Sequence, residues 1–332
     1  MRTLMKDGWK KFFLFKLPGT LAVILILIEA LALALKEVRP NRHDLDRLAI
    51  VADHSNETIN SNIIVFGDSV TQDVLKTFKI GVEGQVANLT TNKASGIVGS
   101  YLLLSRYLQS QPAPKTVAFA ATPEFFAFSP EGDVAELYLR SVFHHENEQD
   151  YIDGYLGEKR SSAPISLMHM EERIGTKIIS VLSPAPEKFP MGNRVPDTTS
   201  FASDANVQAH VLDDILKRAE RPIDIPLKNS DVFSEICTLA QKHKFNIHIV
   251  FAPVPISLFK AWKKNGMFTS FLTQLRYFFN RGCHDVAVYL DTTLAVVPDH
   301  MMRDADHLIR HAGTSFFANR LNEFVAKLAN SH

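Results

Sequence analysis

The chain has 332 residues, of which 46% are apolar and 22% charged, a composition that suits a folded domain with a full core and excludes a disordered protein. Lysine plus arginine and aspartate plus glutamate number 36 each, and no basic stripe with interleaved aromatic residues occurs, so no nucleic-acid partner is expected. No Cys/His cluster has zinc spacing, and neither a metal nor another cofactor is expected. The two cysteines, Cys237 and Cys283, are equally consistent with one disulfide in an oxidising compartment and with burial as small apolar side chains.

The chain starts with a short basic tail, residues 1–16, followed by a mostly apolar stretch over residues 17–35. At about 1.5 Å per residue, a helix over this stretch spans about 28 Å, close to the thickness of the hydrocarbon layer. We therefore expect a single transmembrane anchor with a cytoplasmic tail, so that the rest of the chain lies on the periplasmic or extracellular side. The alternative is a signal peptide, because Ala30-Leu31-Ala32 and Ala32-Leu33-Ala34 match the Ala-x-Ala cleavage pattern.

A polar segment over residues 36–61 is expected to form a stalk, after which the apolar run 62–67 predicts a buried strand. The next residues predict a helix, so Ser69 would lie on a tight strand-to-helix turn. A serine there exposes its hydroxyl at the carboxyl end of a sheet, and its own N–H can stabilise a developing oxyanion. Gly67 and Asp68 are expected to support the turn. The alternative role for the serine is a helix N-cap.

Two further strands are predicted at 85–89 and 116–121, with a helix over 96–109 between them. The segment after the first of these strands contains Gly96 and Gly99.

Residues 129–230 interrupt the alternation of strands and helices with a long, loop-rich stretch that contains several prolines. Long insertions beside the functional face of a sheet often act as lids or substrate grooves, so this insertion is the expected source of specificity. Beyond it, strands are predicted at 246–252 and 286–291, and a final helix at 314–329. The whole pattern over residues 62–330 indicates an α/β domain with a mostly parallel, doubly wound sheet.

A carboxylate and a histidine stand three residues apart near the end of the chain, at Asp304 and His307. A serine hydroxyl is a poor nucleophile until an imidazole takes its proton, and the imidazole needs an acceptor that fixes its tautomer. Ser69, His307 and Asp304 are the residue types that this chemistry requires, as nucleophile, base and orienting partner. Asp306 is the alternative orienting carboxylate.

The segments Ile63–Leu75 and Asp304–His307 resemble the first and last blocks of the SGNH (GDSL-type) hydrolase and acyltransferase superfamily. The resemblance implies a three-layer, flavodoxin-like domain after the N-terminal transmembrane helix, with the serine, histidine and aspartate in the catalytic roles given above. Family members usually complete the oxyanion hole with a Gly in a second block and an Asn in a third. The resemblance therefore implies the N–H of Gly96 or Gly99 as a candidate oxyanion donor, together with the N–H of Ser69. This chain has Thr122-Pro123-Glu124 where the third block should follow its strand, and no Asn. That pattern and Ile247–Pro255 are similar to the membrane-associated branch, which includes teichoic-acid D-alanylation and alginate O-acetylation proteins.

The resemblance implies a membrane-anchored, envelope-facing serine enzyme that transfers or removes an O-acyl group, such as acetyl, on an extracellular polysaccharide. The implied partners are an acyl donor, a polysaccharide or lipid acceptor, the membrane and a membrane-bound acyl exporter. Two alternatives stay open. One is a lipase or esterase that releases acyl groups to water. The other is a degenerate domain that serves as a scaffold subunit of an envelope assembly.

Overall fold

The computed structural model describes residues 16–17, 19–20, 51–52, 61–77, 86–157, 205–309 and 312–330. All of these except 16–17 and 19–20 belong to one compact unit, made of Arg47–Arg160 and Pro190–His332. Nearly all of the predicted anchor and stalk, and residues 158–204 of the predicted insertion, lie outside the described residues. Among the residues that are described, no helix is both long enough and apolar enough to cross a membrane.

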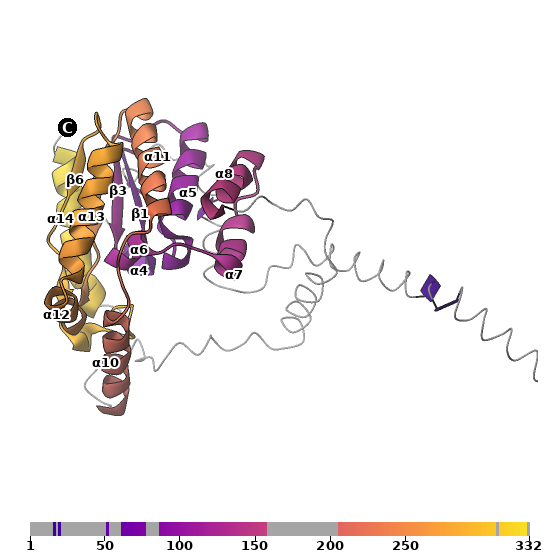
Figure 1. Ribbon diagram of the computed structural model, residues 1–332. Coiled ribbons are helices and arrows are strands. Elements are labelled where there is room, and N and C mark those ends of the chain that lie inside the picture. The colour runs from indigo at the N-terminus through magenta and orange to yellow at the C-terminus, as the bar shows by residue number, and fades with distance from the viewer. Residues whose placement is uncertain are drawn as a thin grey trace, which may run out of the picture. The chain divides into compact units, whose positions relative to one another are not determined.

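The predicted α/β class and its parallel sheet are confirmed. Five strands form one sheet in the order β2-β1-β3-β4-β6, and every neighbouring pair is parallel. Figure 1 labels β1, β3 and β6 in this order across the sheet. The two central strands β1 and β3 are buried at every residue, as expected for continuous apolar runs in a parallel sheet that is covered on both faces. The five strands are β1 (Ile63–Gly67), β2 (Val86–Asn88), β3 (Thr116–Ala121), β4 (Asn246–Phe251) and β6 (Val288–Leu290).

Helices connect the strands and cover the sheet in two layers. The α-helices are α4 (Ser69–Thr77), α5 (Gly96–Ser110), α6 (Pro123–Ala127), α7 (Gly132–Ala135), α8 (Glu146–Leu156), α10 (Ala205–Ala219), α11 (Leu227–His243), α12 (Ile256–Lys264), α13 (Met267–Gly282) and α14 (Ala312–Asn330). Shorter elements are η3 (Lys93–Ser95), η4 (Glu136–Arg140), η6 (Asp299–Met301) and the two-stranded sheet of β5 (Val254–Pro255) and β7 (Val296–Val297).

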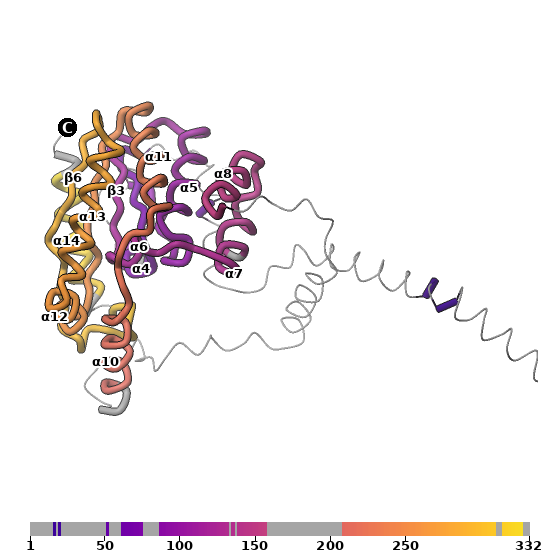
Figure 2. Tube along the Cα trace, viewed as in Figure 1, coloured from indigo at the N-terminus to yellow at the C-terminus, as the bar shows by residue number. Residues whose placement is uncertain are grey.

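The strand order determines which helices share a layer. The chain moves from β1 to β2 in one direction and then returns across β1 to β3 in the other. Because connections between parallel strands are right-handed, α4 and α5 lie on opposite faces of the sheet. Helix α11 contacts both α5 and α13 on one face, while α14 contacts α4 on the other. Figure 2 follows α5, α11 and α13 as neighbouring tubes in front of β3.

The layer between the sheet and α11 holds an aromatic cluster around Phe126. Its ring lies 6.4 Å from that of Phe233, 6.1 Å from that of Phe251 and 6.3 Å from that of Phe271. A disulfide between Cys237 and Cys283 joins α11 to the residue after α13, with the two Cα atoms 5.0 Å apart. Of the two alternatives for the cysteines, the structure therefore has the disulfide.

The described parts of the predicted insertion, residues 129–157 and 205–230, contain more helix than its loop-rich sequence indicates. They contain α7, η4, α8 and α10, and α11 already begins at Leu227. Helix α8 is anchored to α5 by a buried ion pair in which Arg106 Nη2 lies 2.7 Å from Glu148 Oε2. In this pair each of the two buried charges is compensated by the other, so loss of either partner would leave an uncompensated buried charge.

Candidate active site

Ser69 is the first residue of α4, at the carboxyl end of β1. In the parallel pairing of β1 with β3, Gly67 stands opposite Ala120, and a Cβ on Gly67 would lie 2.0 Å from the Ala120 carbonyl oxygen. Only glycine fits so close an approach of two backbones. The first N–H groups of a helix have no acceptor within it, so the Ser69 N–H is available to a ligand at this edge of the sheet.

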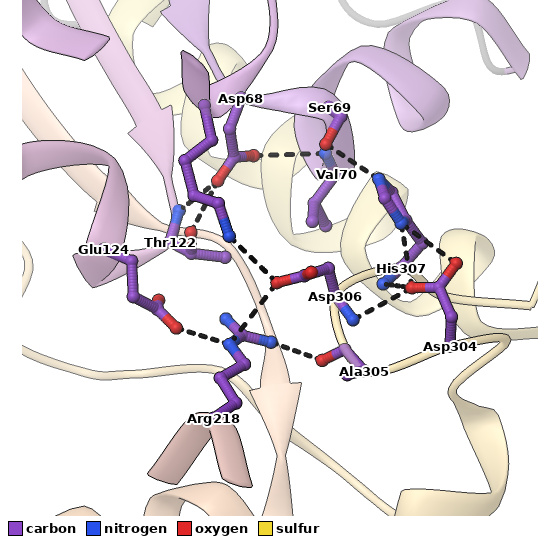
Figure 3. Close-up of polar contacts among 11 residues, drawn as sticks. Asp68, Ser69, Val70, Thr122, Glu124, Arg218, Asp304, Ala305, Asp306 and His307 are labelled. Atoms are coloured by element: carbon purple, nitrogen blue, oxygen red, sulfur yellow. Dashed lines mark hydrogen bonds and ion pairs between the residues drawn. The ribbon is translucent and has the colours of Figure 1, made fainter. Parts of the chain in front are cut away.

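Asp68 is buried beside the serine and ties the turn to the end of β3 (Figure 3). Its Oδ1 accepts hydrogen bonds from the N–H groups of Val70 (3.1 Å) and Thr71 (3.4 Å). Its Oδ2 accepts from the N–H (2.8 Å) and the hydroxyl (2.6 Å) of Thr122. The carboxylate therefore caps α4 and fixes the serine turn against the neighbouring strand.

Ser69, His307 and Asp304 lie together, although the serine and the histidine are 238 positions apart in the chain (Figure 3). The distance from Ser69 Oγ to His307 Nε2 is 2.8 Å, and His307 Nδ1 lies 2.9 and 3.1 Å from the two carboxylate oxygens of Asp304. With Nδ1–H donating to the carboxylate, Nε2 is left to accept the serine proton. Asp304, and not the alternative Asp306, occupies the orienting position.

A short loop holds the histidine in place. Met302 and Leu308 form an antiparallel bridge across it, and the Arg303 N–H donates to the His307 carbonyl at 2.8 Å. Within the loop, Asp304 Oδ1 also accepts from the His307 N–H at 2.8 Å. The imidazole is thus fixed through its backbone as well as through its ring.

The charges of the pair stabilise each other. Burial of the ring lowers the pKa of His307, but the hydrogen bond to Asp304 and its charge outweigh burial, so the pKa is raised from its ordinary value. Burial alone raises the pKa of Asp304, but the hydrogen bonds from the His307 ring and from the backbone of Asp306 and His307 hold it well below its usual range. Asp304 therefore stays ionised, as an orienting partner must.

The loop between β2 and α5 runs beside the serine turn. The Thr91 N–H donates to the Gly67 carbonyl at 3.0 Å, and the side-chain amide of Gln72 donates to the Thr90 carbonyl at 3.2 Å. The next residue of the loop is Asn92. Its Oδ1 accepts from the N–H of residue 95 at 3.3 Å, whereas its Nδ2 is buried and has no hydrogen-bond partner in the described part of the chain.

The two glycines predicted as oxyanion donors lie at the start of α5, but their N–H groups are already engaged. The Gly96 N–H donates to the Lys93 carbonyl. The N-cap of α5 is Ser95, whose carbonyl accepts the first intrahelical hydrogen bond, the one from Gly99. The structure therefore gives no support to Gly96 or Gly99 as oxyanion donors.

A cluster of charged side chains surrounds the histidine loop. Asp306 Oδ1 lies 3.1 Å from Lys93 Nζ and 3.4 Å from Arg218 Nε, and Arg218 Nε also lies 2.5 Å from Glu124 Oε1. Figure 3 shows Arg218 between Glu124, which follows β3, and the loop that carries His307. Sequence patterns do not connect these residues, since 94 positions separate Arg218 from Glu124. The sequence contains one local indication, an acidic residue, Glu124, three positions beyond a strand that is predicted to end at the site.

Neither protein-family models nor curated proteins match this chain when the sequences are compared. In the portion of the chain that the structure describes, no group of three or more His, Cys, Asp or Glu side chains could hold a metal ion. The arrangement that these residues do make, a serine hydroxyl paired with an oriented imidazole, has the parts needed for nucleophilic acyl transfer.

Proposed function

We propose that the protein is a serine-dependent acyl-transfer enzyme of the SGNH type. The observation that carries the proposal is the 2.8 Å contact between Ser69 Oγ and His307 Nε2. The other ring nitrogen of the same histidine, Nδ1, lies 2.9 Å from Asp304. The alternative role of the serine as an N-cap does not account for this arrangement, because the carboxylate of Asp68 already accepts the N–H groups that a cap would serve.

The reaction follows from the positions of the three side chains. His307 Nε2 takes the hydroxyl proton as Ser69 Oγ attacks the ester carbonyl carbon, and the same proton then goes to the departing alkoxide. This leaves an acyl-serine and a free alcohol. In the second half-reaction His307 takes a proton from an acceptor hydroxyl, whose oxygen attacks the acyl carbon. The proton returns to Ser69 Oγ as the new ester leaves.

The oxyanion that forms in each half-reaction needs hydrogen-bond donors. We assign this role to the Ser69 N–H and to Asn92 Nδ2. Asn92 follows two residues that bond to the serine turn, and its amide nitrogen is a buried donor without a partner among the described residues. Such groups are rare because they cost free energy, so they call for a functional explanation. Thr122, at the end of β3, cannot serve, because both of its donors bind Asp68.

The proposed substrate is an acetyl or similar O-acyl ester, and the proposed acceptor is an extracellular polysaccharide. This part rests on the resemblance of the chain to the membrane-associated branch of the superfamily and on the apolar stretch over residues 17–35. The Cys237–Cys283 disulfide supports a location outside the reducing cytosol, on the periplasmic or extracellular side of the membrane. The partners in this proposal are an acyl donor, the polysaccharide and a membrane-bound exporter of acyl groups.

The test uses the full-length protein, purified in detergent and incubated with p-nitrophenyl acetate, with intact-mass and peptide mass spectrometry as the readout. We expect an acetyl adduct on the Ser69 peptide that is lost in Ser69→Ala and forms far more slowly in His307→Ala. Ser110→Ala, which removes an exposed hydroxyl from α5, is the control and should behave like the wild type. Acetylated product from added sugar acceptors would indicate a transferase, and release to water alone an esterase.

A folded protein that gives neither adduct nor release above background would overturn the enzymatic proposal. The scaffold alternative would then be favoured. It also predicts that cells carrying Ser69→Ala keep the full function of the protein.

A further inference from the structure

Arg218, the penultimate residue of α10, is a buried cation at the edge of the candidate active site. Its side chain is 6% exposed, and its guanidinium contacts three separate segments of the chain. Nε lies 2.5 Å from Glu124 Oε1 on α6, and Nη1 donates to the Ala305 carbonyl at 2.5 Å. The guanidinium carbon also lies 6.0 Å from the centre of the Trp262 ring on α12.

The contact with the Ala305 carbonyl bears most directly on the histidine. Ala305 lies between Asp304 and Asp306, two residues before His307, in the loop that positions the imidazole. The fork of a guanidinium can donate in two directions at once. Arg218 uses it to join this loop to the end of β3, through Glu124. Since a buried arginine is destabilising unless it is paired, its partners cannot separate without cost, and the loop is held.

We propose that Arg218 is a positioning residue, which fixes the loop 304–307 so that His307 Nε2 stays within reach of Ser69 Oγ. This inference rests on the proposed function, because it assigns Arg218 a part in the same reaction. It also gives α10, which lies in the predicted insertion, a role in the catalytic geometry. A displacement of about 1 Å in a catalytic group costs about 10²-fold in rate. Arg218→Met, which is of similar length but uncharged, should therefore lower kcat about 10²-fold with little change in KM.

A second readout separates positioning from folding alone. Arg218 lies 3.4 Å from Asp306, whose negative charge raises the pKa of His307, and offsets that charge. Without Arg218, Asp306 favours the protonated ring more strongly, and His307 must be neutral to act as a base. The acid limb of the pH–rate profile should move to higher pH by about one unit. The charged groups of the site are Arg303, Asp304 and Asp306 on the histidine loop, Asp73 on α4, Asp68 before α4, Lys93 after β2, Glu124 on α6 and Arg218 on α10.

The experiment compares full-length wild type with Arg218→Met, Arg218→Lys and the control Arg221→Met, which alters an exposed arginine just after α10. The readouts are the steady-state parameters with p-nitrophenyl acetate and the rate at which a fluorophosphonate labels Ser69, each as a function of pH. Lysine keeps the charge but cannot donate to Glu124 and the Ala305 carbonyl together. Arg218→Lys should therefore keep the wild-type acid limb and lose about tenfold in kcat and in labelling rate.

The outcomes distinguish this inference from the proposed function. If Ser69→Ala retains activity, the proposed function itself fails. If Ser69→Ala is inactive while Arg218→Lys keeps wild-type kcat and labelling rate, the positioning role of Arg218 is overturned and the proposed function stands. The lysine variant decides this even where Arg218→Met does not fold, since it preserves the buried charge.

Discussion

Replacement of Asp68 provides a direct test of how the serine turn is held. Its buried carboxylate accepts hydrogen bonds from the Thr122 N–H, the Thr122 hydroxyl and the Val70 N–H at 2.8, 2.6 and 3.1 Å. Asp68→Ala leaves all three donors buried without this acceptor. At about 1.5 kcal/mol for each, the free energy of unfolding should fall by about 4.5 kcal/mol. The bond from Thr71, at 3.4 Å, is too long to add much.

Asp68→Asn should cost about half as much, about 2 kcal/mol, because the amide keeps one acceptor oxygen and presents an N–H₂ group to the remaining donors. The measurement is equilibrium unfolding in urea, with the slope compared between variants to check that the same surface unfolds. Asp285→Ala, at an exposed aspartate, is the control and should change stability by less than about 0.5 kcal/mol. If Asp68→Ala is no more destabilising than this control, the turn is not held through Asp68.

Three further predictions concern the reaction and the disulfide. Asn92→Asp keeps an acceptor for the Ser95 N–H but has no amide donor, so kcat should fall about 10²- to 10³-fold. Unchanged kcat would exclude the oxyanion role. The pKa of His307 is raised above its ordinary value, and the ring must be neutral to act as a base. kcat/KM should therefore rise with pH, with a midpoint above about 6.5. A midpoint below that value would contradict the assignment of His307 as the base. The Cys237–Cys283 disulfide joins residues 46 positions apart. The double variant Cys237→Ala with Cys283→Ala should therefore lower the free energy of unfolding, measured in urea, by about 4 kcal/mol. An unchanged unfolding midpoint would show that the disulfide does not contribute to stability.

The linkage between folding and pH has the opposite sign for the two members of the His307–Asp304 pair. His307 has a raised pKa in the folded protein, so its contribution to stability is complete at pH below the ordinary histidine value and is lost as pH rises through the folded value. Asp304 has a lowered pKa, so its contribution is present above the ordinary aspartate value and is lost as pH falls toward the folded value.

The sheet and the serine–histidine–aspartate group could be predicted from sequence because each has a local pattern. The central strands are continuous apolar runs, and the predicted bounds 116–121 agree with the observed Thr116–Ala121. The serine stands on a recognisable strand-to-helix turn, and the histidine and its aspartate are three residues apart. Such features are encoded by neighbouring residues, so a single sequence contains them.

Features that depend on distant contacts could not be predicted in the same way. Nothing in the local sequence of α10 shows that the side chain of Arg218 is buried against Ala305, 87 positions away. Gly96 and Gly99 were predicted as oxyanion donors because the family that the chain resembles usually supplies one from a glycine in its second block. Which N–H groups are free depends on how the helix begins, and the 3₁₀ turn Lys93–Ser95 that uses the Gly96 N–H has no clear sequence pattern.

The separation of 238 positions between Ser69 and His307 also affects when the protein can act. In the proposed reaction the nucleophile is made early in synthesis and its base almost last, so a growing chain carries an unactivated hydroxyl. The base is made only after β3, β4 and β6, since the loop of His307 follows the last of these strands. A product truncated before residue 304 would therefore keep the serine without its base, and the proposed reaction predicts that it is inert.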